Sequence, residues 1–366
     1  MKNKINNKNG ITLIALVITI IVLVILAGVS ISMISSQDGI LNRASQVKEI
    51  SDAAQKRDME YINKQEGMIE QYIEGTLANK VNVGDYVEYN YGTGSEYTTS
   101  SNDSEGKDIS STVQTFNSTE TGNAFINKWR VLSKTDGTLK LVSANVGADI
   151  TLNGANGYLN GEKILNGICK KLYSSNIGEA RSINVEDINE ITGYNGDKCY
   201  YDNDGNKITI AKNEKKTISN LENDANLNLN RLTNRVCPED GKDIGDYEVE
   251  EYSYVCKNQM SIEDENNNVK YQVICRDSNN SANLKTYWLA SSNVSVRFKT
   301  GYAYFNMRWL GEGSTGLFSQ GAYWLMDSKG TSREKTYAFR PVIELKNGLK
   351  VGEGNGTINS PYKIVE

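Results

Sequence analysis

The chain opens with an abrupt change from polar to apolar positions. Residues 1–10 are polar and contain Lys2, Lys4 and Lys8, whereas residues 11–34 are almost wholly apolar. As a helix, this apolar block would be roughly 36 Å long, which is enough to cross a bilayer. Because lysines flank only its N-terminal side, the positive-inside tendency keeps that side in the cytoplasm. The pattern predicts a single-pass membrane protein whose C-terminal part is extracellular.

Helical spacing continues after the apolar block. No proline occurs between Ile40 and Glu74. Apolar residues recur there near helical spacing, at Ile40, Ala44, Val47, Ala54, Tyr61, Met68 and Tyr72. We expect one continuous or once-bent helix from about Thr12 to Glu74, in which residues 35–75 form a stalk. The periodicity then changes, and a separate globular domain is expected over residues 76–366.

Beyond the stalk, the alternation typical of strands replaces helical spacing. Two apolar-polar runs at residues 129–132 and 139–142 flank Asp136-Gly137, which predicts a β-hairpin. Further strands are expected at residues 83–89, 294–298, 303–307 and 339–345. The expected fold class is therefore α+β: a long N-terminal membrane and stalk helix, followed by a mixed domain with an antiparallel sheet.

Short helices are expected between the strands. Apolar spacing predicts one over residues 164–172, and Asn184 is placed to cap another. The run Asp202-Asn203-Asp204-Gly205-Asn206 has the start of a calcium-binding EF-hand loop, but Ala211 stands where that loop needs a glutamate. A hairpin turn at Asp204-Gly205 is the better interpretation, and no metal site is predicted.

The N-terminal boundary also carries a resemblance. The stretch that follows the basic leader reads Gly10-Ile11-Thr12-Leu13-Ile14-Ala15-Leu16. It resembles the cleavage and methylation signal of type IV prepilins and type II secretion pseudopilins. The resemblance implies processing by a prepilin peptidase between Gly10 and Ile11. It implies a leader at residues 1–10 and a transmembrane helix at residues 11–34.

Two positions depart from that family. Ile11 stands where the first mature residue is usually Phe, and Ala15 stands where the fifth is usually Glu. In the family this Glu pairs with the N-terminal amine of a neighbour within the apolar layer, where an unpaired amine is costly. Ala15 therefore favours a minor or tip subunit, or an unassembled surface protein, over a major pilin. A plain membrane anchor and a secretory signal peptide are the alternatives, although signal peptides have apolar cores of about 7–15 residues.

A second resemblance covers the globular domain. It rests on Tyr287-Trp288-Leu289-Ala290-Ser291-Ser292 and on Phe339-Arg340-Pro341-Val342-Ile343-Glu344-Leu345. These segments are similar to a bacterial surface domain of unknown function that often follows such leaders. Its pattern is similar to C-type-lectin-like folds, so the resemblance implies such a fold over residues 83–366. A shared fold does not fix a function.

Aromatic and basic residues interleave in the C-terminal part, at Tyr287, Trp288, Arg297, Phe298, Lys299, Tyr302, Tyr304, Arg308 and Trp309. One interpretation is a surface on which sugars or single-stranded DNA stack, and Tyr287, Trp288 and Trp309 are its candidate ligand-binding residues. The other is that the aromatic residues lie in the core on one strand face and the cations are solvated on the other.

Composition narrows the chemistry. The chain has no histidine, which excludes Ser-His-Asp, Cys-His and imidazole-metal sites. Its net charge of −5 does not favour nucleic acid as a partner. Residues 211–270 are charged and rich in Asn, so loops and short elements inserted in the domain are expected there, with the charged run at 263–268 as solvated surface. The five cysteines allow up to two disulfides outside the cell, or act as small buried apolar residues.

These observations together predict a non-enzymatic, pilin-like cell-surface protein with an extracellular binding or adhesion domain. No catalytic residue and no cofactor is predicted. The expected partners are the membrane, prepilin peptidase, other pilin-like subunits and a carbohydrate or other surface ligand. A structural pseudopilus subunit for secretion or DNA uptake is the second hypothesis, and an anchored hydrolase with carboxylate or Ser-Lys chemistry is the third.

Overall fold

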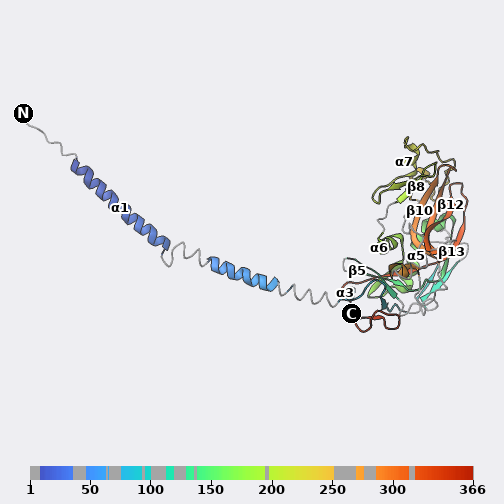
Figure 1. Ribbon diagram of the computed structural model, residues 1–366, viewed down its shortest axis with the longest axis horizontal. Helices are drawn as coiled ribbons and strands as arrows, with labels where there is room; N and C mark the ends of the chain where they lie inside the picture. The colour runs from blue at the N-terminus through green and yellow to red at the C-terminus, as the bar shows by residue number, and fades with distance from the viewer. Residues whose placement is uncertain are drawn as a thin grey trace, which may run out of the picture. The chain divides into compact units, whose positions relative to one another are not determined.

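The chain forms two compact units, Met1–Ile73 and Glu74–Glu366. The computed structural model describes residues 9–35, 47–62, 65, 76–92, 95–99, 113–118, 129–135, 138–193, 198–250, 269–275, 286–312 and 318–365. One apolar helix begins the first unit, and the second unit is a mixture of helices and largely antiparallel sheets (Figure 1). This confirms the α+β class expected from the sequence.

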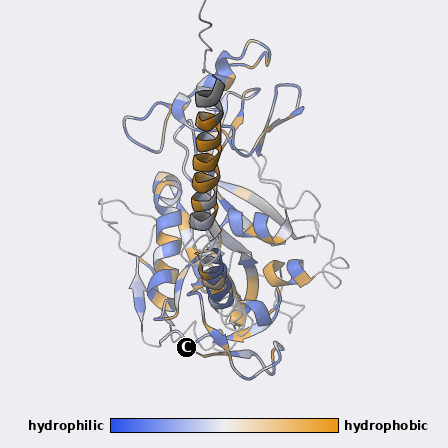
Figure 2. Ribbon diagram, turned by 90° about the vertical axis from the view of Figure 1, so that its left-hand side faces the viewer, coloured by the Kyte–Doolittle hydropathy of each residue, from blue (hydrophilic) through white to orange (hydrophobic). Residues whose placement is uncertain are grey.

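Helix α1 (Asn9–Ser35) is apolar around its whole circumference (Figure 2). Its segment Ile14–Ser32 is long and apolar enough to cross a membrane, and none of it is buried within the protein. Polar side chains inside this segment bond to its own backbone: the Thr19 hydroxyl donates to the Ala15 carbonyl at 2.6 Å. Such internal bonding removes the cost of placing a hydroxyl in lipid.

The expected stalk is helical where the structure describes it. Residues 47–62 form a helix with mostly exposed side chains. Residues 36–46 and 66–75 lie outside the described residues, so the continuity of the long helix stays a prediction.

The globular unit contains a seven-stranded sheet in the order β15-β16-β1-β4-β5-β14-β7. Its strands are β1 (Tyr86–Glu88), β4 (Trp129–Thr135), β5 (Thr138–Ser143), β7 (Gly178–Ser182), β14 (Pro341–Leu345), β15 (Lys350–Val351) and β16 (Tyr362–Val365). The expected hairpin is the antiparallel β4–β5 pair, in which Trp129 lies opposite Ser143. Only the β1–β16 pair in this sheet is parallel among the described strands.

A second, five-stranded sheet has the order β12-β11-β10-β13-β6. Its strands are β6 (Asp149–Asn153), β10 (Tyr287–Arg297), β11 (Tyr302–Glu312), β12 (Phe318–Asp327) and β13 (Glu334–Ala338). Two small antiparallel pairs complete the strands: β2 (Glu96–Thr98) with β3 (Thr115–Asn117), and β8 (Lys198–Tyr201) with β9 (Lys207–Ile210). Strands β10 and β11 correspond to the two alternating runs of the sequence.

Helix α5 (Gly154–Tyr173) packs against strands of both sheets. It begins ten residues before the helix expected at 164–172. The sequence pattern did not predict this first part, because Gly157 and Gly161 lower helix propensity. In the structure these glycines allow close packing: a Cβ on Gly157 would lie 3.0–3.2 Å from Leu325 and Leu152 atoms. Glycine lowers helix propensity, but at these two positions a larger residue would clash with the sheet.

The remaining described helical elements are short: α3 (Leu77–Lys80), α6 (Val185–Thr192), α7 (Ile218–Asn223), the 3-10 turn η1 (Ile244–Asp246) and α9 (Val269–Cys275). The cap predicted for α6 is confirmed. The Asn184 side chain accepts from the Asp187 amide, and the Asp187 carboxylate accepts from the Asn184 amide, forming a capping box.

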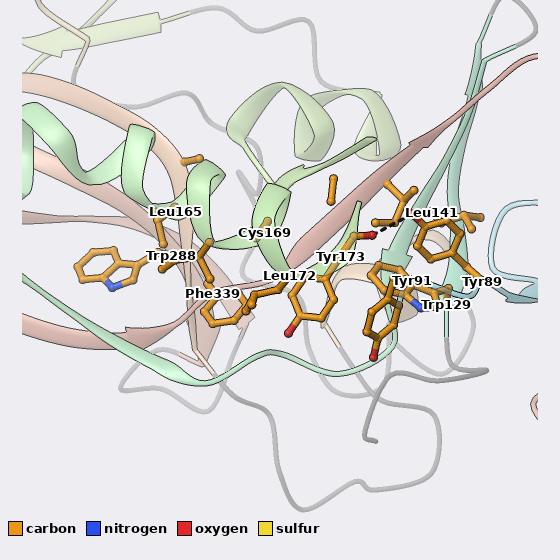
Figure 3. Close-up of a cluster of buried hydrophobic side chains, with 14 of the residues drawn as sticks. Tyr89, Tyr91, Trp129, Leu141, Leu165, Cys169, Leu172, Tyr173, Trp288 and Phe339 are labelled. Atoms are coloured by element: carbon orange, nitrogen blue, oxygen red, sulfur yellow. Dashed lines mark hydrogen bonds between the residues drawn. The ribbon is translucent and has the colours of Figure 1, made fainter. Parts of the chain in front are cut away.

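The main core lies around α5, between the two sheets (Figure 3). Tyr89 and Tyr91 from the segment after β1 meet Trp129 and Tyr173 edge-on, with ring centroids 5.0–6.1 Å apart. The Tyr89 hydroxyl donates to the Tyr173 carbonyl at 2.8 Å, so its polar end is satisfied. Burial raises the pKa of Tyr89 to about 12, and the phenol stays neutral.

Residues 211–250 contain the expected loops and short elements, α7 and η1, and they also contribute a core of their own, which the sequence did not predict. Ile218, Leu221, Ile244 and Tyr247 are buried against Phe305 and its neighbours on the five-stranded sheet. Apolar residues are widely spaced among charged ones here, so the local sequence lacks a periodic signal. The charged run at 263–268 lies outside the described residues.

Gly147 sits where the chain crosses Phe339. A Cβ at this position would approach three atoms of the buried Phe339 ring closer than 3.0 Å. We expect Gly147→Ala to lower the free energy of unfolding by about 1–3 kcal/mol, because the ring is fixed by Phe116 and Tyr173. Urea unfolding followed by tryptophan fluorescence measures it. Gly92→Ala is the matched control, since no atom of the described residues lies within 4 Å of its added Cβ; equal loss in both variants would contradict the packing argument.

Candidate functional site

Two of the three candidate ligand-binding residues lie in the core. Tyr287 is 1% exposed and Trp288 is 0% exposed. The Trp288 indole N–H donates to the Ile150 carbonyl at 3.1 Å, and the Tyr287 hydroxyl donates to the Ile274 carbonyl at 2.8 Å. Neither side chain presents surface to a ligand. The structure therefore corrects the expectation for these two residues, and the interpretation as core aromatics fits them.

Arg340, in the 339–345 segment of the second resemblance, also has a structural role. Its side chain is buried and donates to the carbonyls of Ser143, Val273 and Ile274 at 2.6–3.2 Å. Its guanidinium lies 5.1 Å from the centroid of the Tyr287 ring. The last carbonyls of helix α9 are thus held by the arginine that the sequence places beside Pro341. The segments 287–292 and 339–345, which carry the second resemblance, therefore meet in the interior. There they stabilise the fold and do not form a binding surface.

Trp309 is the third candidate and is half-buried. Its ring lies 5.6 Å from that of Tyr337, on the sheet face that also carries Trp288. The Lys335 ammonium lies 4.9 Å from the Tyr337 ring centroid. Trp309 therefore extends the main core toward the surface, and its own ring is partly covered by these neighbours.

The opposite face of the five-stranded sheet is polar. Residues opposite one another in an antiparallel ladder share a face. The register pairs Arg297 with Tyr302, Ser295 with Tyr304, Asn293 with Asn306, and Asn306 with Trp324. We call this the polar face, defined by Asn293, Ser295, Arg297, Tyr302, Tyr304, Asn306, Arg308 and Trp324.

Burial changes along the polar face. At one end Arg308 is 1% exposed, and its Nη2 donates to Glu250 Oε1 at 2.9 Å. At the other end Tyr302, Tyr304 and Trp324 are half-buried. The rings of Tyr304 and Trp324 are 5.7 Å apart. The simple division into core aromatics and solvated cations therefore fails on this face, because one arginine is buried and several aromatic rings are partly open.

Two cations lie over the open end. The Lys329 ammonium is 4.1 Å from the Tyr302 ring centroid, and the Arg333 guanidinium is 3.7 Å from that of Trp324. A hydrogen bond with Tyr302 raises the pKa of Lys329. Cations placed over rings in this way keep positive charge beside flat apolar surface.

A pocket of about 360 Å³ lies at this open end. It is lined by the β8–β9 loop (Tyr201, Asp202, Asn203, Asp204, Gly205) and by the β10–β11 turn (Arg297, Phe298, Lys299, Thr300). The volume is within the range of roughly 300–1,000 Å³ that small-molecule sites occupy. Nearly a hundred residues of sequence separate its two walls.

Hydrogen bonds within the loop hold the β8–β9 wall. The predicted hairpin is confirmed, and the turn at Asp204-Gly205 lies within a five-residue loop between paired Tyr201 and Lys207. Both carboxylate oxygens of Asp202 accept hydrogen bonds inside this loop, from Asp204 and Asn206, at 2.8–3.0 Å. These bonds, with that from the Asn206 side chain first, lower the pKa of Asp202. Asp202 therefore shapes the loop.

Arg297 and Asn203 are two of the polar side chains that line the pocket. Burial lowers the pKa of the half-buried Arg297 guanidinium, and its Nη1 donates to the Val296 carbonyl at 3.2 Å. Asn203 Nδ2 donates to the Asn228 carbonyl at 3.1 Å. Asn203 Oδ1 is out of contact with solvent and accepts no hydrogen bond from the part of the chain that the structure describes. A buried acceptor without a donor costs about 1–3 kcal/mol.

The sequence pointed only partly to this site. The alternation that placed Arg297 beside aromatic residues was visible, and Arg297, Lys299, Tyr302 and Tyr304 belonged to the interleaved set. The second wall was not visible, because a failed calcium motif gives no reason to place residues 201–205 beside strand β10. Within the described residues no group of three or more metal-ligating side chains occurs.

Four of the five cysteines lie among the described residues. No disulfide joins Cys169, Cys199, Cys237 and Cys275 to one another. Cys169 is wholly buried, and burial raises its pKa, as expected of a small apolar core residue. Cys256 lies outside the described residues. The processing residues Gly10 and Ile11 fall within α1, where only the backbone is described.

Comparisons of the chain with protein-family models, with curated proteins and with solved structures find no match.

Proposed function

We propose that this chain is a membrane-anchored cell-surface protein of the type IV pilin-like kind, a minor pilin or pseudopilin, that presents an extracellular binding domain. Helix α1 carries the proposal. Its segment Ile14–Ser32 is exposed, apolar and long enough to span a bilayer. Exposed apolar surface of this extent needs lipid or protein to cover it. The basic leader that ends at Gly10 supports a prepilin-type origin for this anchor.

Binding rather than catalysis is the function proposed for the globular unit. The chain has no histidine. The pocket at the end of the polar face combines aromatic and charged side chains, and hydrogen bonds that fix its loop lower the pKa of Asp202. A C-type-lectin-like relationship is part of this proposal, and it is supported by the contact between Arg340 and the buried Tyr287 ring, which joins the two segments that carry the resemblance.

Processing gives one prediction. Protein isolated from membranes of the native host should begin at Ile11, because Gly10 ends a basic leader directly before the apolar helix. Mass spectrometry of the N-terminal peptide measures this. Replacement of Gly10 by Leu should leave the full leader in place, while Asn9→Leu should still be cut. An intact Met1, or a start beyond Ala27, in the unaltered protein would contradict the prepilin-like proposal.

Surface display is tested on intact cells. Protease added to cells should release fragments of residues 76–366 while the membrane helix stays with the cell. Cells that carry the full chain should also adhere to an envelope or matrix surface better than cells that lack it. A globular unit protected from protease until the cells are lysed would contradict the proposed orientation. Unchanged adherence would contradict the binding role.

A further inference from the structure

We infer that the 47–62 helix pairs with the same helix of a second copy of this chain, as a parallel two-stranded coiled coil beside the membrane. The inference goes beyond the proposed function and takes from it only the membrane anchor. It rests on an exposed apolar stripe, which we call the stalk seam and define by Val47, Ile50, Ala54 and Tyr61. Val47, Ile50 and Tyr61 are 65–67% exposed within one copy of the chain.

The stalk seam has the spacing of a coiled coil. Apolar residues occupy every seventh position of the sequence here: Ile40, Val47, Ala54, Tyr61 and Met68. Ile50 follows Val47 by three residues, so the two stand as a and d of one heptad. Residues 47–62 form an unbroken helix, which brings the a and d positions of this segment onto one side.

The width of the stalk seam selects its occupant. On a helix of 3.6 residues per turn, its four residues fall within an arc of roughly 60°. Arg57 borders this arc on one side and Asp58 on the other. A helix that packs on a globular core needs an apolar face of about 100° or more, whereas a narrow a and d stripe fits a second helix. The stalk seam therefore matches another helix better than the surface of a domain.

The membrane anchor sets the direction of pairing. Two copies anchored through the apolar segment Ile14–Ser32 stand in one membrane with the same orientation, so their 47–62 helices run parallel. Anchoring in one plane also raises the effective concentration of each helix for the other. A short seam that contains one small residue, Ala54, is then sufficient for pairing. The pair presents two globular units to one external surface.

The charges that border the stalk seam favour the parallel, in-register arrangement. In such a pair, a side chain at d enters a hole that is formed by two a residues, d and e of the partner helix. Arg57 stands at d and Asp58 at e, so each guanidinium lies beside the carboxylate of the other copy. Among the described residues, Arg57 bonds through its Nε alone, to the Ala53 carbonyl at 3.3 Å, so both terminal nitrogens are left for that carboxylate. The two ion pairs offset the repulsion between the two arginines.

Photo-crosslinking of the full chain in cell membranes tests the pairing. Benzoylphenylalanine replaces either Tyr61, in the stalk seam, or Met59, on the opposite side of the helix. Met59 is the matched control, because the two side chains are 66% and 67% exposed. We expect a covalent dimer of twice the chain's mass from position 61 and at least tenfold less from position 59. Equal dimer from both positions, no dimer from position 61, or a crosslink from position 61 into the globular unit of the same chain would overturn the inference.

Variants test the seam and the register separately. Energy transfer between labelled copies of the full chain in lipid vesicles measures pairing. Ile50→Asp should weaken pairing at least tenfold, whereas Met59→Asp should change it less than twofold, although both residues are 67% exposed. Arg57→Glu and Asp58→Arg should each weaken pairing, and the two together should restore it, because the ion pairs form again with reversed charges. Equal loss in the two aspartate variants would overturn the seam, and no recovery in the charge-reversed variant would overturn the parallel register.

The outcome is separable from the proposed function. A chain that stays in the membrane fraction and adheres to external surfaces without pairing would leave the anchored binding protein standing and remove the dimer. A chain recovered outside the membrane fraction would remove the anchor itself, and with it the common orientation on which the parallel pair depends.

Discussion

Replacing Arg340 by alanine is expected to lower the free energy of unfolding of the globular unit by about 3–5 kcal/mol. Arg340 is 2% exposed, and its guanidinium donates to three backbone carbonyls, those of Ser143, Val273 and Ile274. Removing it takes this donor from the buried Ser143 and Val273 carbonyls, whereas the Ile274 carbonyl keeps the hydrogen bond from the Tyr287 hydroxyl. Each buried unsatisfied acceptor costs about 1–3 kcal/mol, and the lost side chain leaves a cavity as well.

The position of these carbonyls makes the effect large. Val273 and Ile274 belong to the last turn of α9, where backbone carbonyls have no partner within the helix. Arg130 holds the preceding carbonyl, that of Gln272, at 3.2 Å. Arg130 of β4 and Arg340, which directly precedes β14, therefore tie α9 to the seven-stranded sheet. Loss of Arg340 should loosen α9 together with the Val342 and Leu132 cluster on which it packs.

The measurement is urea unfolding of the full chain in detergent micelles, followed by tryptophan fluorescence. All four tryptophans, Trp129, Trp288, Trp309 and Trp324, lie in the globular unit, so the signal reports this unit alone. Arg340→Lys should retain about half of the stabilisation, because an ammonium cannot span the same three carbonyls in one plane. Arg231→Ala, at an exposed arginine, is the control and should change stability by less than about 0.5 kcal/mol. A loss below 1 kcal/mol in Arg340→Ala would show that α9 does not depend on this contact.

Elements with strong local signals could be predicted from the sequence. The capping box at Asn184 needs only residues three apart, and the β4–β5 and β8–β9 hairpins need only alternating runs around a turn. The membrane-spanning helix could be predicted from the length of its apolar run alone. In each case the physical cause lies within about 25 residues of chain, so the pattern is visible without the fold.

The first half of helix α5 and the core formed by residues 211–250 were not predicted, because tertiary contacts outweigh local preference there. Gly157 and Gly161 lower helix propensity, yet the sheet requires small residues at those positions. Leu221 and Ile244 are isolated among polar residues, and only their packing on Phe305 gives them a role. Local periodicity cannot predict such a core, because its residues are buried by a strand that is distant in sequence.

The candidate site shows the same limit. Trp288 and Tyr287 were attractive because exposed aromatics bind sugars, but burial cannot be read from residue type. Arg297 and Tyr304 were present in the same interleaved run and lie at the open end of the polar face. Tyr287 and Trp288 differ from Arg297 and Tyr304 in how far other elements bury them at each end of the sheet. That cover comes from elements far away in sequence, such as β8, which meets β10 beside the pocket.

Assembly at the anchor gives the second large prediction. Expressed with a compatible prepilin peptidase and no other pilin, this chain should form no filaments. In the pilin-like interpretation Ala15 occupies the position from which a glutamate neutralises the N-terminal amine of a neighbour. A buried charge left without its partner costs about 3–5 kcal/mol. Because every copy in a filament of this chain alone would carry such an amine, the cost would recur at every subunit.

Ala15 lies one helical turn beyond Ile11 within α1, and its carbonyl already accepts the Thr19 hydroxyl at 2.6 Å. The backbone there is thus regular, and a longer side chain at this exposed position requires no rearrangement of the helix. Ala15→Glu should therefore restore the charge partner and allow assembly, while Ala15→Gln, of equal size without the charge, should not.

Electron microscopy of material sheared from cells distinguishes these outcomes. Filaments in Ala15→Glu alone would show that the missing carboxylate limits assembly. Filaments of the unaltered chain would show that the amine is neutralised in another way, and the charge argument would fail. Absence of filaments in all three variants would place the limit elsewhere in the chain, and the carboxylate would then be insufficient. A chain that cannot extend a filament beyond itself is suited to the tip of a mixed filament, or to single display on the membrane, where its globular unit meets external ligands first.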